Sequence, residues 1–247
     1  MAADSELLLL LLAEQLKTPW LQVAYAAELS RQQAAIPTAA GADATERLHT
    51  TVEVVSQAAL QLIDGYLLSA QLEFGDTDPG LEPVSMSSTL YDVAQRLDGY
   101  AKAYDCQLEL KLQGRSAPVM ANRRALDAAL TNLGYSFIEA AHHTLQSRED
   151  NRLHSNVTLV MRHNAQGLSA GMFSQLDGLS NELLKRARVL YGYARQPLSG
   201  FTSGSGAGVF VADALISSMD SRLKTSRYGE LTGLAATFVP SRQLAMV

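Results

Sequence analysis

The chain has 247 residues, of which 47% are hydrophobic and 18% are charged, and its formal net charge is −5 at pH 7. This acidic balance argues against a surface for nucleic acid or for anionic membranes. The single cysteine, Cys106, excludes an internal disulfide and a zinc site built from several cysteines. The chain is long enough for one large globular domain or two modest ones, and one thiol suits a cytoplasmic location.

Six consecutive leucines occupy positions 7–12, near the start of the chain. Two acidic residues precede them where a signal peptide carries Lys or Arg, and Glu14 ends the run far short of the ~20 residues that a bilayer span needs. We therefore expect a buried helix over residues 4–35 and no membrane segment. Pro19 lies inside this helix, where a proline costs about 3 kcal/mol, so the kink requires a structural reason.

Residues 36–43 contain proline and glycine and predict a loop, after which Asp43 or Thr45 caps a second helix. Two long helices joined by a short loop form an antiparallel hairpin. Its apolar surface favours pairing of two chains into a four-helix bundle, so we predict a homodimerisation domain over residues 1–73. The second helix shows a heptad seam, with apolar residues at alternating spacings of four and three: Leu48, Val52, Val55, Ala59, Leu62 and Tyr66.

The turn-rich stretch 73–80 predicts a linker, and the pattern changes to mixed α and β over a second domain, residues 83–247. The expected fold is therefore α+β. In chain order we expect a helix over 88–104, strands at 108–112 and 118–121, a helix over 122–145, a strand at 157–161, a long loose segment, a helix from Gly206, and strands at 221–227 and 231–239.

The stretch Glu14-Gln15-Leu16-Lys17-Thr18-Pro19-Trp20 resembles the motif His-Glu-Leu-Arg-Thr-Pro-Leu of the sensor histidine kinases. The order of elements is also similar to theirs, over nearly the whole chain. The resemblance implies a helical hairpin that forms a four-helix bundle as a dimer, followed by an α/β sandwich of the histidine-kinase ATPase (Bergerat) type. In that family the proline bends the first helix, which explains the kink in part.

The resemblance also shows where the chain departs from the family. The histidine that accepts phosphate is Glu14 here, and a carboxylate cannot form the phosphoramidate of the relay. The acidic residue after that histidine is Gln15. Thr18 remains, and in the family this threonine helps to place water for dephosphorylation of a receiver domain. Gln15 and Thr18 lie three apart and share one helical face, so they form a candidate catalytic pair of a receiver phosphatase.

A second family motif is Asn-x-x-x-Asn, whose second Asn coordinates the magnesium held by ATP. Asn132 matches its first position, and Ser136 replaces its second. A hydroxyl is a weaker magnesium ligand than an amide carbonyl.

A third family motif, Asp-x-Gly-x-Gly-Ile, ends a strand and reads the adenine amine. We match it to His163-Asn164-Ala165-Gln166-Gly167-Leu168, in which His163 takes the place of the aspartate and Gly167 that of the second glycine. The loss of the acceptor for a buried amine costs about 1–3 kcal/mol. This match therefore predicts weaker recognition of adenine.

The last motif, Gly204-Ser205-Gly206-Ala207-Gly208-Val209, resembles Gly-x-Gly-Leu-Gly-Leu. In the family, glycines at the positions of Gly204, Gly206 and Gly208 let backbone amides at a helix start approach phosphates. The ATP site that the resemblance implies is therefore partly lost. We expect weakened binding of ATP and magnesium, no bound cofactor, and no metal site of the chain's own.

Three hypotheses for function follow. The chain is a catalytically degenerate, histidine-kinase-like protein that binds a response-regulator receiver or a sister kinase, since the positions of Glu14, Ser136 and His163 have each lost a separate chemical role. Alternatively, it is a phosphatase of a phosphorylated response regulator, using Gln15 and Thr18. A third possibility is a nucleotide-binding switch without phosphotransfer.

Overall fold

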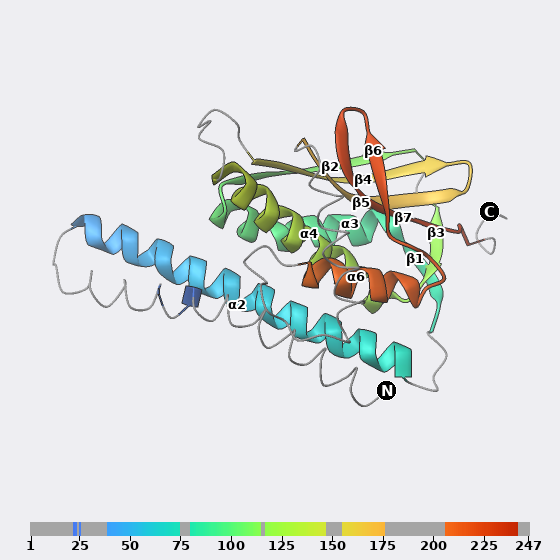
Figure 1. The fold of residues 1–247 in the computed structure, drawn as a ribbon, viewed down its shortest axis with the longest axis horizontal. Helices are drawn as coiled ribbons and strands as arrows, with labels where there is room; N and C mark the ends of the chain where they lie inside the picture. The colour runs from blue at the N-terminus through green and yellow to red at the C-terminus, as the bar shows by residue number, and fades with distance from the viewer. Residues whose placement is uncertain are drawn as a thin grey trace, which may run out of the picture.

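The computed structural model describes residues 22–23, 25, 39–74, 80–114, 117–146, 155–175 and 206–241. Within these ranges the fold is mixed α and β (Figure 1). The helices are α2 (Ala39–Phe74), α3 (Met86–Ala103), α4 (Arg123–Gln146) and α6 (Ala207–Ser217). The strands are β1 (Glu82–Ser85), β2 (Cys106–Gln113), β3 (Pro118–Ala121), β4 (Ser155–Asn164), β5 (Gly167–Ser174), β6 (Lys224–Tyr228) and β7 (Leu231–Phe238).

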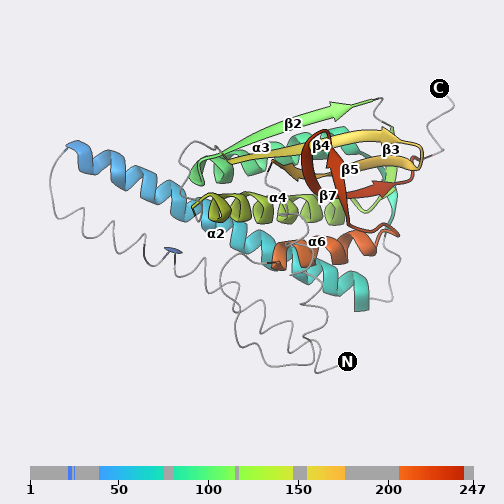
Figure 2. The same ribbon diagram turned by 45° about the horizontal axis from the view of Figure 1, so that its top comes forward.

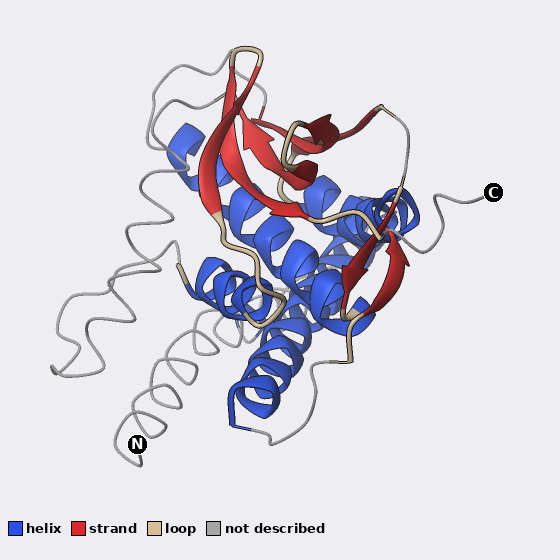
Figure 3. Ribbon diagram, turned by 90° about the vertical axis from the view of Figure 1, so that its right-hand side faces the viewer, coloured by secondary structure: helices blue, strands red, loops and turns tan. Residues whose placement is uncertain are grey.

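The main sheet has five strands in the order β2-β4-β5-β7-β6, and β1 pairs with β3 in a separate two-stranded sheet. Strands β2 and β4 are parallel, whereas the other neighbours in the main sheet are antiparallel. The helices gather on one face of this sheet (Figure 3). Alternate residues of β4, Val157, Leu159 and Met161, point into the core that the sheet shares with the helices.

Helix α2 lies along α4 and α6, on the side of these helices that faces away from the sheet (Figures 1 and 2). Tyr66 of α2 is 8% exposed and belongs to the same core as α4, and Leu62, Leu68 and Leu72 pack against that core. The second half of α2 therefore buries apolar surface against the α/β layers of its own chain. The division into domains over 1–73 and 83–247 stays a prediction, as does the four-helix bundle.

Helix α2 begins at Ala39, so the predicted loop is wrong over residues 39–43, and the predicted cap at Asp43 or Thr45 is wrong too. Four of the first six residues of α2 are alanines, and alanine has the highest helix propensity. This propensity outweighs the single glycine at position 41. Of the predicted helix over 4–35, only Gln22, Val23 and Tyr25 are described, and these are helical.

The predicted long loose segment after β4 is also wrong at its start, because residues 167–174 form β5 in the middle of the sheet. Every residue of β5 is buried. Its glycine, serine and alanine residues have low strand propensity, so the sequence does not read as a strand. Small side chains nevertheless suit a strand that is covered on both faces.

The remaining predicted elements, α3, β2, β3, α4, α6, β6 and β7, are confirmed to within a few residues at each end. The four-residue strand β1 was not predicted, since Pro83 and its exposed neighbours give no apolar alternation. None of the helices described here combines the length and the apolar character that crossing a bilayer requires. The leucine run lies outside the described residues.

Candidate functional site

Asn132 and Ser136 lie one turn apart on α4, and both are buried, at 1% and 5% exposure. The amide nitrogen of Asn132 donates to the carbonyl oxygen of Ala128 at 2.9 Å and to that of Gln61 on α2 at 3.4 Å. Both N–H groups of the side-chain amide therefore have acceptors. One of these bonds ties α4 directly to α2.

The contact between α2 and α4 is closest at Gly65. A Cβ added there would lie 2.6 Å from Nδ2 of Asn132 and 3.0 Å from Cγ1 of Val211 on α6. Real Cβ atoms do not approach other atoms as closely as the first of these distances, so glycine is needed for the observed packing. Helix α2 thus covers Asn132 and the adjoining part of α6.

Gly206 and Gly208 hold the start of α6 against α4. Gly206 is buried, precedes the first residue of α6, and its carbonyl oxygen accepts from the backbone N–H of Phe210 at 2.7 Å. A Cβ at Gly208 would lie 2.3 Å from Oγ of Ser136 and 2.7 Å from the carbonyl oxygen of Asn132. The first turn of α6 therefore lies directly on the two positions that the resemblance assigns to magnesium–ATP.

On the side of Ser136 that faces α6 there is no space for a magnesium ion. Magnesium keeps several waters and needs an octahedral shell of oxygens, which occupies more space than a methyl group. Between Gly208 and Ser136 not even a methyl group fits. The side-chain amide nitrogen of Asn132 is engaged by α2 through the carbonyl oxygen of Gln61.

His163 and Gly167 lie on either side of the tight turn between β4 and β5. Strands β4 and β5 form an antiparallel hairpin in which His163 pairs with Leu168 and Asn164 with Gly167, so a two-residue turn follows β4 directly. His163 is exposed. Gly167 has φ +145°, and a Cβ there would lie 2.3 Å from the carbonyl oxygen of Phe238 on β7, so this glycine serves the backbone of the sheet.

The match of His163 and Gly167 to the adenine motif stays a prediction. His163 is the second-to-last residue of β4, at the end of a strand as the motif requires. Strand β5 follows it and ends at Ser174, which is 1% exposed.

The positions Glu14, Gln15, Thr18 and Gly204 lie outside the described residues, so their proposed roles stay predictions. Within the ranges that the structure describes, no three residues among His, Cys, Asp and Glu are placed to hold a metal ion.

A half-buried carboxyl group, that of Glu139, lies farther along α4. Burial raises the pKa of Glu139 to about 7. Burial also raises the pKa of Tyr100, with a smaller contribution from the nearby Glu139 carboxylate. The ring of Tyr100 contacts those of Tyr104 and Tyr135, each at 4.6 Å between centroids. This aromatic surround explains the desolvation of the carboxyl group.

No model of a protein family matches the sequence, and no curated protein matches it. Among solved structures, the chain is similar to the histidine kinase AdeS of Acinetobacter baumannii, with a TM-score of 0.51 and 15% identity over 92% of this chain and 98% of that one. The chain has a histidine-kinase fold. A structure of full-length ShkA in complex with AMPPNP is also similar, with a TM-score of 0.51 and 18% identity over 92% of this chain and 46% of ShkA.

The histidine-kinase fold accounts for the α+β architecture and for a long helix ahead of the sheet. It also agrees with the resemblance that the sequence motifs carry. At 15% and 18% sequence identity, the similarity shows the fold alone. The chemistry of the site depends on the residues of this chain.

Proposed function

We propose that this chain is a catalytically degenerate, histidine-kinase-like protein of two-component signalling. In this proposal it binds a response-regulator receiver or a sister kinase and does not phosphorylate itself. The observation that carries the proposal is the close contact of α2 and α6 with α4 over Asn132 and Ser136. A kinase must hold magnesium–ATP at these positions, and this packing supports the proposal because it occupies the sides of Asn132 and Ser136 that face α2 and α6.

Substitutions at three separate positions support the same conclusion. Glu14 stands at the acceptor position, Ser136 at the magnesium position and His163 at the position that reads adenine. Each substitution removes a different chemical role. The apolar residues that build the fold remain in place, since α4 and β5 are buried as a histidine-kinase fold requires. Such a pattern fits a protein selected for its surface more than for phosphoryl transfer.

The proposal is tested first by nucleotide binding. We expect no thermal shift with millimolar magnesium–ATP or magnesium–ADP, because binding would require α2 to leave α4. A ligand at 100 times its dissociation constant would stabilise the fold by about 2.7 kcal/mol, which is easily seen for a domain of this size. A saturable shift would favour the alternative of a nucleotide-binding switch. Acid-labile label on the chain after incubation with γ-labelled ATP would overturn the proposal.

Partner binding is tested with a panel of purified receiver domains from the source organism, each with and without acyl phosphate. We expect saturable binding of at least one receiver and no change in its rate of dephosphorylation. Faster loss of phosphate that Thr18→Ala abolishes would show that the chain is a phosphatase. If no receiver and no histidine kinase of the organism binds, the proposed function is wrong.

A further inference from the structure

The face of the main sheet that points away from the helices carries a row of small and polar side chains. Leu168, Ala170 and Met172 of β5 point into the core, so Ser169 points to the opposite face. Across this face Arg162 of β4 is paired with Ser169, and Ser169 is paired with Thr237 of β7. The next row contains Gly171, Ala235 and Lys224. Small side chains at the centre of both rows leave space above the sheet.

The β6–β7 hairpin curls over this face. The guanidinium of Arg162 donates from Nη1 to the carbonyl oxygen of Arg227 and from Nη2 to Oγ of Ser226, both at 2.8 Å. Nε2 of Gln113 on β2 donates to the hydroxyl of Tyr228 at 2.6 Å. These bonds join the edge strand β6 to strands on the other side of the sheet, although β6 is paired only with β7. The sheet is therefore rolled into a trough.

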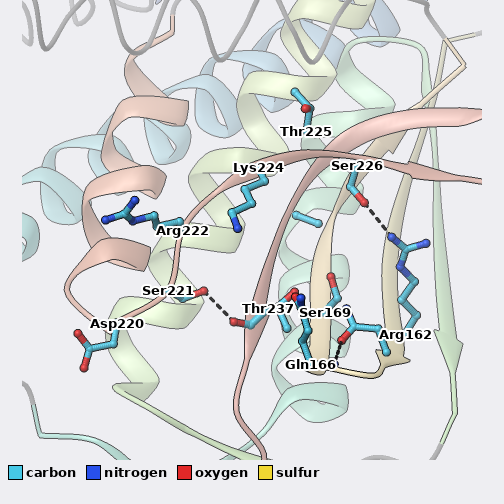
Figure 4. Close-up of a pocket in the computed structure, with 12 residues that line it drawn as sticks. Arg162, Gln166, Ser169, Asp220, Ser221, Arg222, Lys224, Thr225, Ser226 and Thr237 are labelled. Carbon is cyan, nitrogen blue, oxygen red and sulfur yellow. Dashed lines mark hydrogen bonds between the residues drawn. The ribbon is translucent and has the colours of Figure 1, made fainter.

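The trough holds a cavity of about 410 Å³ that is open to solvent (Figure 4). This volume lies within the range of small-molecule sites, about 300–1,000 Å³. Among the described residues that line it, Ala235 alone has a purely apolar side chain, and hydroxyl or amide groups come from Asn164, Gln166, Ser169, Ser221, Thr225, Ser226 and Thr237. A ligand here therefore meets many groups that can form hydrogen bonds.

The cavity is basic although the whole chain is acidic. Arg162, Arg222 and Lys224 line it against one carboxylate, Asp220. In Figure 4, Lys224 extends toward the side where Ser169 and Thr237 lie, whereas Arg222 extends away from them. Among the described residues, no carboxylate forms an ion pair with Lys224 or Arg162. Two cations around one cavity repel each other unless an anion lies between them.

The donors that remain unused suit an anion with several oxygens. Arg162 uses two N–H groups in its bonds to β6, which also fix its orientation, and a guanidinium has five. Ser169 is 5% exposed, and within the described part of the chain its hydroxyl forms no hydrogen bond. Arginine, lysine and hydroxyl donors converging from three strands fit the tetrahedral oxygens of a phosphate.

We propose that this cavity binds a small phosphate-bearing molecule, with inorganic phosphate as its minimal form. The site lies on the opposite face of the sheet from Asn132, so it is independent of any nucleotide site of the histidine-kinase fold. It also does not depend on the proposed function. Lys224 supplies a charge that no described carboxylate pairs with, Arg162 supplies a preoriented guanidinium, and Ser169 supplies a neutral donor from the floor of the cavity.

The test is isothermal titration calorimetry of the full chain in a phosphate-free buffer. The probes are inorganic phosphate, glycerol 3-phosphate, glycerol and succinate. We expect saturable binding of both phosphates and none of glycerol. Tighter binding of glycerol 3-phosphate than of inorganic phosphate would mean that the organic part also contributes, which extends the proposal to phosphate monoesters. Equal binding of succinate would overturn the assignment of phosphate, and no binding of either phosphate at about 10 mM would overturn the site.

Two variants that remove one positive charge each separate this site from general electrostatic attraction. Lys224→Gln should weaken binding of inorganic phosphate by at least about tenfold, because it removes a cation that faces the cavity. Lys102→Gln is the matched control, since Lys102 lies on α3 with its side chain 74% exposed and paired with Asp98. Its affinity should equal that of the parent chain. Equal affinities of all three proteins would contradict the proposal, and thermal melts verify that both variants fold.

Discussion

At the scale of single residues, two glycines allow the helices of this fold to approach one another closely. Gly65 and Gly208 are the points where α2 and α6 lie directly on α4, with no space for a Cβ on either. The resemblance assigns the third glycine of the motif, the position of Gly208, to the approach of phosphate. In this chain Gly208 serves helix packing against Ser136, so the same residue type in the same motif has a different physical role.

Two substitutions of glycine by alanine should therefore have opposite effects. Gly65→Ala should destabilise the fold by about 1–3 kcal/mol, since the new methyl group overlaps Nδ2 of Asn132. Gly99→Ala, in α3, should stabilise it by up to about 1 kcal/mol, because its Cβ would meet only Cγ2 of Val54, at 3.8 Å. Urea denaturation measures both. Equal effects of the two substitutions would contradict the close packing of α2 on α4.

The raised pKa of Glu139 predicts how the free energy of unfolding depends on pH. Its pKa is raised from the ordinary value of 4.5 to about 7 in the folded chain, so the folded state binds more protons than the unfolded state between these values. Stability is therefore highest below the unfolded pKa, falls as pH rises through this window, and levels off above about pH 7, with a loss of up to about 3 kcal/mol.

The substitution Glu139→Gln removes this carboxyl group and should flatten the dependence between about pH 5 and pH 8. At the upper pH the variant should be more stable than the parent chain. Asp98→Asn, at an exposed ion pair on α3, is the control and should leave the slope unchanged. An unchanged slope in Glu139→Gln would show that Glu139 is not the group responsible. Urea midpoints across this pH range provide the measurement.

At the scale of elements, α2 uses its apolar residues in two directions. The predicted seam ends in Leu62 and Tyr66, and these residues pack into the core that α4 builds within the same chain. Leu60 and Leu67 lie seven residues apart and are 60% and 51% exposed, so they form an apolar stripe on the outer side of the helix. This stripe is the surface of α2 that remains for the predicted dimer.

We expect Leu60→Asp combined with Leu67→Asp to shift the chain from dimer to monomer, because two buried carboxylates would face their symmetry copies. Sedimentation velocity measures the change. The control is Tyr91→Asp, which alters a side chain that is 56% exposed on α3, away from α2. A parent chain that is already monomeric, or a dimer that survives the double substitution, would contradict a bundle formed through this stripe.

At the scale of the whole molecule, the two faces of the main sheet are covered differently. On one face of the sheet α3 and α4 pack on the strands, and α2 lies along α4 and α6 on their far side (Figure 2). On the opposite face the curled β6–β7 hairpin borders a polar, basic cavity. This cavity lies on the other side of the sheet from Asn132.

The sequence alone was sufficient where structure is local. Apolar periodicity predicted α3, α4 and α6, alternation predicted β2 and β7, and the motifs pointed to the histidine-kinase fold that the comparisons support. The prediction from sequence failed where two local conformational preferences opposed each other. At the start of α2, the helix propensity of the alanines opposes the turn preference of Gly41. The prediction from sequence also failed at β5, because its small residues have low strand propensity.

Only the tertiary structure decided the features that bear on function. Asn132 can face a ligand or the backbone of α2, and the distance between α2 and α4 decides which. Gly65 and Gly208 permit close packing on α4, but glycines in a sequence do not by themselves require it. The cavity depends on the roll of the sheet, which brings Arg162 to β6 from 64 residues away in sequence. A sequence motif shows which chemical groups a chain has. Packing between distant segments determines which of those groups remain open to a ligand.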